Sequence, residues 1–130
     1  MLKLLALLFF TITLGMAQGA NAGPFEDGHA AYTRGDYATA LRLWSPLAAQ
    51  GYAEAQHNLG VMYENGTGVP QDYARAYMWF NLSAASSSGE DGKLAINNRN
   101  KAAAKMTSAQ IEQAQEMARK CQASNFKNCD

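Results

Sequence analysis

The clearest pattern in the chain is a helical spacing of apolar side chains in residues 36–49. One stripe contains Tyr37, Ala40, Leu41, Trp44, Leu47 and Ala48. Apolar residues that recur every three or four positions lie on one face of an α-helix. Asp36 precedes the stripe and can cap the helix, since its carboxylate can accept from the first free backbone N–H groups. Pro46 is expected to distort the last turn.

Comparable patterns predict six helices. The expected ranges are 25–34, 36–49, 53–64, 72–86, 90–105 and 108–122. The last one starts with a capping box of Thr107 and Gln110, flanked by a hydrophobic staple of Met106 and Ile111. Its expected buried stripe is Ile111, Ala114, Ala118 and Cys121. Short turns separate the helices, so consecutive helices should form three hairpins.

The composition supports an all-α fold. After residue 22, the β-branched apolar residues are Val61, Val69, Ile96 and Ile111 alone. Strands draw on such residues, so a sheet is not expected. Alanine, glutamine and leucine dominate instead, and these residues favour helix.

The helical pattern repeats along the chain. Residues 36–49 align with residues 72–85 at an offset of 36, which pairs Asp-Tyr with Asp-Tyr and Trp44 with Phe80. The preceding helices align at an offset of 31, so the second copy has five extra residues, within 66–71, between its helices. Glycine in this segment permits positive φ. Pro70 suits the first turn of the following helix.

Residues 55–85 resemble one full Sel-one-like repeat, a relative of the tetratricopeptide repeat. The residues that carry the resemblance are Ala55, Leu59, Gly60, Tyr63, Gly66, Gly68, Val69, Asp72, Ala76, Trp79, Phe80, Ala84 and Ala85. The resemblance implies a right-handed α-solenoid of three helical hairpins that binds or scaffolds other proteins, without a catalytic residue or cofactor. The expected repeats cover 25–51 and 52–88, and a divergent closing hairpin covers 89–122. Each hairpin buries its apolar face only against its neighbours.

The first 22 residues have the pattern of a secretory signal peptide. Lys3 precedes an apolar run over 4–16, and Ala20-Asn21-Ala22 is a small-x-small cleavage site. The run is shorter than the ~20 residues of a transmembrane helix, although an uncleaved anchor is an alternative. We therefore expect cleavage after Ala22 and a periplasmic or secreted bacterial protein without membrane attachment. A repeat domain over 23–122 and a tail over 123–130 would remain.

The candidate binding face is on the first helix of the second repeat. Stacked hairpins leave a concave face lined by the first helix of each pair. A helical wheel of 53–64 puts Tyr52, Ala55, Gln56, Leu59, Gly60 and Tyr63 on the buried side. The opposite side presents Glu54, His57, Asn58, Val61 and Glu64 as candidate contacts for a peptide or partner helix. A merely solvated helix face is the alternative.

Cys121 and Cys129 are expected to form a disulfide, because both lie in the part of the chain predicted to be exported. On one continuous helix they would be about 12 Å apart, which is too far for a disulfide. The helix should therefore end soon after Cys121, turn back at Ser124-Asn125 and tuck Phe126 underneath. A metal site with His29 or His57 is the alternative, but no ligand spacing supports zinc.

The charges and motifs favour a binding protein over an enzyme. Eleven basic residues balance eleven acidic ones, which gives no electrostatic reason to bind nucleic acid or an anionic membrane. We find no pattern of a catalytic triad, phosphate-binding loop or paired carboxylates. Two other functions remain open. One is a β-lactamase-like hydrolase, as described for cysteine-rich relatives; the other is cell-wall glycan binding through exposed aromatic residues.

Overall fold

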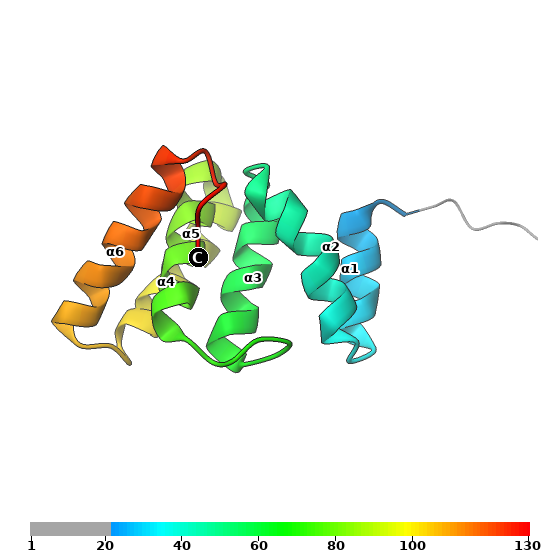
Figure 1. The fold of residues 1–130 in the computed structure, drawn as a ribbon, viewed down its shortest axis with the longest axis horizontal. Coiled ribbons are helices and arrows are strands. Elements are labelled where there is room, and N and C mark those ends of the chain that lie inside the picture. The colour runs from blue at the N-terminus through cyan, green and yellow to red at the C-terminus, as the bar shows by residue number, and fades with distance from the viewer. Residues whose placement is uncertain (1–21) are drawn as a thin grey trace, which may run out of the picture.

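The computed structural model describes residues 22–130 and contains six α-helices in that range. They are α1 (Pro24–Thr33), α2 (Tyr37–Ala49), α3 (Ala53–Asn65), α4 (Tyr73–Ser86), α5 (Gly89–Ala103) and α6 (Ser108–Ala123). Figure 1 shows α1 and α2 at one end of the molecule, α3 in the middle, and α4, α5 and α6 grouped at the other end. The all-α hairpin solenoid is confirmed, and every helix boundary lies within one turn of its predicted position. The predicted signal peptide lies outside the described residues, apart from Ala22.

The predicted helix caps are present. Asp36 accepts a hydrogen bond from the Thr39 backbone N–H at 3.3 Å. Asp72, which was not predicted as a cap, accepts one from the Arg75 backbone N–H at 3.1 Å. Thr107 and Gln110 form the reciprocal capping box that starts α6. Gly66 ends α3 with φ of 67°, a conformation that glycine adopts without strain. Because these caps depend on local side chains, the sequence pattern located them well.

A continuous apolar core runs from α1 to α6. It contains Trp44, Leu59, Met62, Met78, Trp79, Leu82 and several alanines. Gly60 lets α3 and α4 approach closely, since a Cβ at this position would lie 2.6 Å from the Phe80 ring. The aromatic residues Trp44, Trp79 and Phe80 are buried between the helices. The stack is therefore one packed unit.

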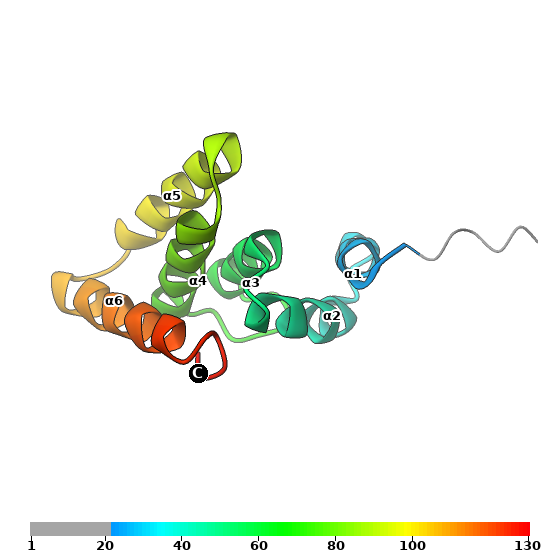
Figure 2. The same cartoon turned by 90° about the horizontal axis from the view of Figure 1, so that it is seen from above.

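Helix α4 is the centre of the C-terminal half, because it packs against α3, α5 and α6. Figure 2 shows α5 and α6 diverging from their connecting turn, with α4 lying between them. A second apolar cluster of Tyr77, Ala102 and Ala114 joins the three helices. Helices α5 and α6 therefore do not pack closely along each other; each packs against α4 instead.

The C-terminal tail folds back as predicted. A disulfide joins Cys121 to Cys129, with their Cα atoms 4.4 Å apart. Asn125 and Phe126 reverse the chain with φ of 57° and 64°. The half-buried Phe126 packs on the core, and its ring lies close to Gly51 in the α2–α3 turn. We call residues 124–130 the C-terminal clasp.

Within residues 22–130, no helix combines the length and apolar character needed to cross a membrane.

Candidate functional site

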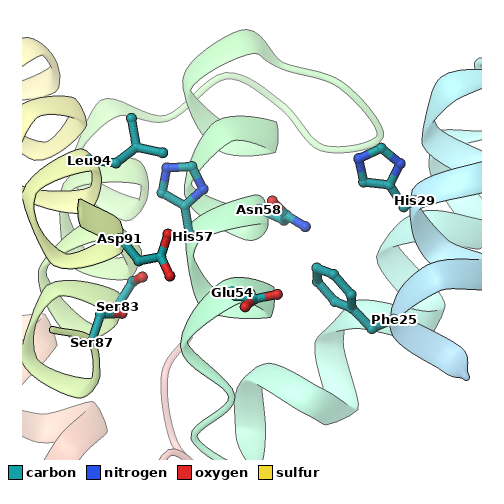
Figure 3. Close-up of a pocket in the computed structure, with 9 residues that line it drawn as sticks. All are labelled: Phe25, His29, Glu54, His57, Asn58, Ser83, Ser87, Asp91 and Leu94. Carbon is teal, nitrogen blue, oxygen red and sulfur yellow. The ribbon is translucent and has the colours of Figure 1, made fainter. Parts of the chain in front are cut away.

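A hollow of about 290 Å³ lies on the face formed by the first helix of each pair. Figure 3 shows α1 on one side of it, α3 at its centre and α5 on the other side. Its lining residues are Phe25, His29, Glu54, His57, Asn58, Ser83, Ser87, Asp91 and Leu94. We call this hollow the concave groove.

Three of the five predicted contact residues line this groove. Glu54 and Asn58 extend from α3 towards α1, while His57 lies on the side of α5 (Figure 3). Val61 lines a smaller adjoining hollow of about 100 Å³, which also includes Asn58. Glu64 lies half-buried near the end of α3 and lines neither hollow. The structure therefore groups the first part of the predicted face and leaves Glu64 apart.

One assignment on the wheel of α3 needs correction. Tyr52 was expected on the buried side, but it is 41% exposed. It precedes the first residue of α3 and packs edge-on against Phe25, with ring centroids 5.3 Å apart. The wheel also left out Met62, which is fully buried. A residue at a helix start follows the direction of the incoming turn, so a helical wheel does not predict its exposure.

Hydrogen bonds between helices hold the walls of the groove. The Trp44 indole N–H donates to the backbone carbonyl of Phe25 at 3.1 Å, which ties α1 to α2. The Ser83 hydroxyl donates to the backbone carbonyl of Ala53 at 2.8 Å, which ties α4 to the start of α3. A hydrogen bond that satisfies a shielded polar group resists separation of the two elements. The backbones that carry Phe25 and Glu54 are therefore held in place.

His57 connects the central helix of the groove to α5. Its Nε2 accepts from the Asn98 side-chain amide at 2.8 Å, and its ring lies 5.3 Å from the Phe80 ring centroid. Burial lowers the pKa of His57, and this outweighs the opposing effects of Asn58 and of the Asp91 and Glu64 carboxylates. The neutral ring that accepts at Nε2 carries its proton on Nδ1. His57 thus acts as a neutral link between α3 and α5.

Sequence reasoning missed the residues that other helices bring to the groove. These are Phe25 and His29 from α1, Ser83 from α4, Ser87 from the α4–α5 turn, and Asp91 and Leu94 from α5. The pairs on α1 and α5 have a spacing of four and three residues, so each lies on one helical face. The same wheel applied to α1 and α5 would have grouped each of these pairs, but it would have found neither Ser83 nor Ser87.

Some polar groups of the groove are engaged in hydrogen bonds within the protein. The Ser83 hydroxyl is already bonded to a backbone carbonyl. In residues 22–130, no group of three histidine, cysteine or acidic side chains is placed to hold a metal ion. Both cysteines are joined to each other. The arrangement can offer hydrogen bonds, negative charge and apolar contact to a ligand.

The fold and the groove together define a class of protein: a helical-repeat module whose concave face is open for binding. The sequence profile of the Sel1 repeat matches residues 20–52 and 53–88, which is more than half of the chain. The chain belongs to the Sel1 repeat family. Repeats of this family generally mediate protein–protein interaction and are generally non-catalytic.

Two curated proteins are similar to part of the chain. DAP3-binding cell death enhancer 1 of Rattus norvegicus is 39% identical over 44 residues, which is 34% of this chain and 9% of the relative. The Mus musculus protein of the same name is 40% identical over 42 residues, which is 32% of this chain and 8% of the relative. The similarity thus spans less than a tenth of these relatives. No solved structure matches the chain significantly.

Proposed function

We propose that this protein is an exported, non-catalytic adaptor whose concave groove binds a short segment of a partner protein. The observation that carries the proposal is the grouping of apolar and polar side chains from α1, α3 and α5 around one open hollow. Phe25 and Leu94 offer apolar contact, and Leu94 is 50% exposed. The Asn58 amide can both donate to and accept from a peptide backbone. This mixture is typical of surfaces that recognise protein segments.

The size of the groove limits the kind of complex. With three helical pairs, the concave face is short, and the hollow is at the small end of ligand sites, which occupy about 300–1,000 Å³. A small interface buries little area and supports weak or transient binding. We expect micromolar affinity for a single segment, or tighter binding when the protein is part of a larger assembly.

Export is the second part of the proposal. It rests on Lys3, the apolar run over 4–16 and the cleavage pattern that ends at Ala22. Helix α1 begins at Pro24, so cleavage at this point would leave every described helix intact. The mass of the protein recovered from the periplasm checks this directly. A mature chain that starts at Gly23 is expected, and an uncleaved chain retained in the membrane fraction would contradict it.

Photocrosslinking in intact cells tests the binding role. A photoreactive residue replaces Asn58 in the full chain, and the matched control places the same residue at Glu112, which is exposed on α6. We expect discrete protein adducts from position 58 that are absent at position 112. Identical adduct patterns at the two positions, or none at 58, would overturn the proposed function of the groove.

A further inference from the structure

The concave groove carries negative charge that the protein does not neutralise. Glu54 and Asp91 line the groove, and Glu26 lines an adjoining hollow together with Phe25 and Glu54. Among residues 22–130, none of these three carboxylates lies within 4.0 Å of a lysine, arginine or histidine nitrogen. All three residues are exposed, and carboxylates gathered around one hollow add their potentials, so the groove attracts cations.

The lysine and arginine side chains of the described residues lie elsewhere, and the groove is lined by the histidines His29 and His57. Neither the groove nor its two adjoining hollows are lined by a lysine or an arginine. Four of the basic residues pair with acids away from these hollows: Arg34 with Asp36, Arg75 with Asp72 and Asp130, Lys93 with Glu90, and Arg119 with Glu116. The whole chain is formally neutral, so the groove differs in charge from the rest of the molecule.

The acidic residues sit beside apolar walls. Phe25 and Leu94 line the same hollow as Glu54 and Asp91 from opposite sides (Figure 3). An apolar ligand side chain between these walls would lose contact with water and gain stability from burial. A cation next to it would lie close to one of the exposed carboxylates at the edge of the apolar contact. An anionic ligand would be repelled, which disfavours nucleic acids and anionic membranes.

We infer that the segment bound in the groove carries a lysine or arginine next to an apolar side chain; this inference rests on the proposed function. The apolar side chain occupies the space between Phe25 and Leu94. The cation pairs with Glu54 or Asp91. Paired charges at an interface suppress wrong partners and fix the register of the bound segment, so the groove selects basic, amphipathic segments of partner proteins.

The test uses random short peptides displayed on phage and selected on the full mature protein. Asn58→Trp, which fills the hollow, identifies the peptides that depend on the groove, and circular dichroism checks that this variant stays helical. Glu54→Gln/Asp91→Asn removes the two charges. Glu112→Gln/Glu116→Gln is the matched control, because it removes the same charge from exposed positions on α6.

We expect groove-dependent peptides to be enriched in lysine or arginine beside an apolar residue. Removing both groove charges should weaken their binding about fivefold or more, and the control variant should change it less than about twofold. Groove-dependent peptides that lack basic residues, or that bind equally well to Glu54→Gln/Asp91→Asn, would overturn the inference and leave the proposed function standing. If no peptide depends on the groove, both fail.

Discussion

The two faces of the helical stack have hollows of comparable size, but the C-terminal clasp lines only one of them. The concave groove of about 290 Å³ is open and lined by unpaired carboxylates. Figure 2 shows the clasp and α5 at opposite sides of the stack. The opposite hollow of about 190 Å³ is lined by residues of α2, α3, α4 and the C-terminal clasp. There the chain supplies its own aromatic side chain, Phe126, and a disulfide that holds it.

The comparison shows how covering an apolar surface affects stability. Apolar surface left in water lowers stability, and the clasp reduces that surface over α2, α3 and α4. Asp130 of the clasp also pairs with Arg75 at 3.4 Å, so its own charge is matched. The concave groove has neither cover nor matched charge, as expected for a face kept free for a segment from another molecule.

The largest effect should come from a residue that holds α1, one wall of the concave groove, against α2. Trp44 is buried, contacts the rings of Phe25 and Tyr32, and bonds to the backbone of α1. Trp44→Ala should lower the free energy of unfolding by about 3–5 kcal/mol, because it leaves a cavity between α1 and α2. Urea unfolding measures this loss. The milder Trp44→Phe keeps most of the packing and loses chiefly the hydrogen bond, which contributes about 1 kcal/mol. Equal losses for the two variants would contradict this account.

The next prediction tests whether the two faces are independent of each other. Cys129→Ser removes the disulfide and should lower the free energy of unfolding by about 2.5 kcal/mol, as the chain-entropy model gives for so short a loop. The tail should become sensitive to protease, whereas peptide binding in the concave groove should stay unchanged. The wild-type protein treated with a reducing agent is the control and should behave like the variant. A loss of groove binding on reduction would mean that the faces are not independent.

The smallest expected effect is a pH dependence of stability that arises from His57 in the concave groove. Burial lowers the pKa of His57, so below its ordinary value of 6.5 the unfolded chain binds more protons than the folded one. The stability that this residue contributes is therefore complete above pH 6.5 and is lost as the pH falls through the lowered pKa of the folded protein. Urea unfolding between about pH 5 and pH 7.5 should show this slope. His57→Gln keeps an acceptor for Asn98 and should flatten the slope; an unchanged slope would exclude His57 as its source.

Local features of the fold were predictable from the sequence. The helix starts follow from caps such as Asp36, Asp72 and Thr107, whose partners lie three residues away. The disulfide was expected because both cysteines lie in the part of the chain predicted to be exported, and the end of α6 soon after Cys121 followed from the reach of a disulfide. These features need only neighbouring residues, and the structure contains them all.

Features that depend on distant packing were predicted less well. The divergence of α5 and α6 depends on how Tyr77 of α4 fits against Ala102 and Ala114, and no spacing in the sequence encodes that fit. The groove likewise combines Phe25, Asn58 and Leu94 from three helices. The face of α3 was predictable from its own periodicity, whereas the opposing walls required the relative positions of α1 and α5.

The central position of α4 has a consequence for how the protein opens. Repeat arrays tend to unfold in units that depend on their nearest neighbours. Helix α4 has three packed neighbours, whereas α1 packs chiefly on α2, at the end of the stack. Amide hydrogen exchange should therefore be slowest in α4 and faster in α1. The wall that holds Phe25 and His29 can then separate while the rest stays folded, so the opening of α1 would set how quickly a segment enters and leaves.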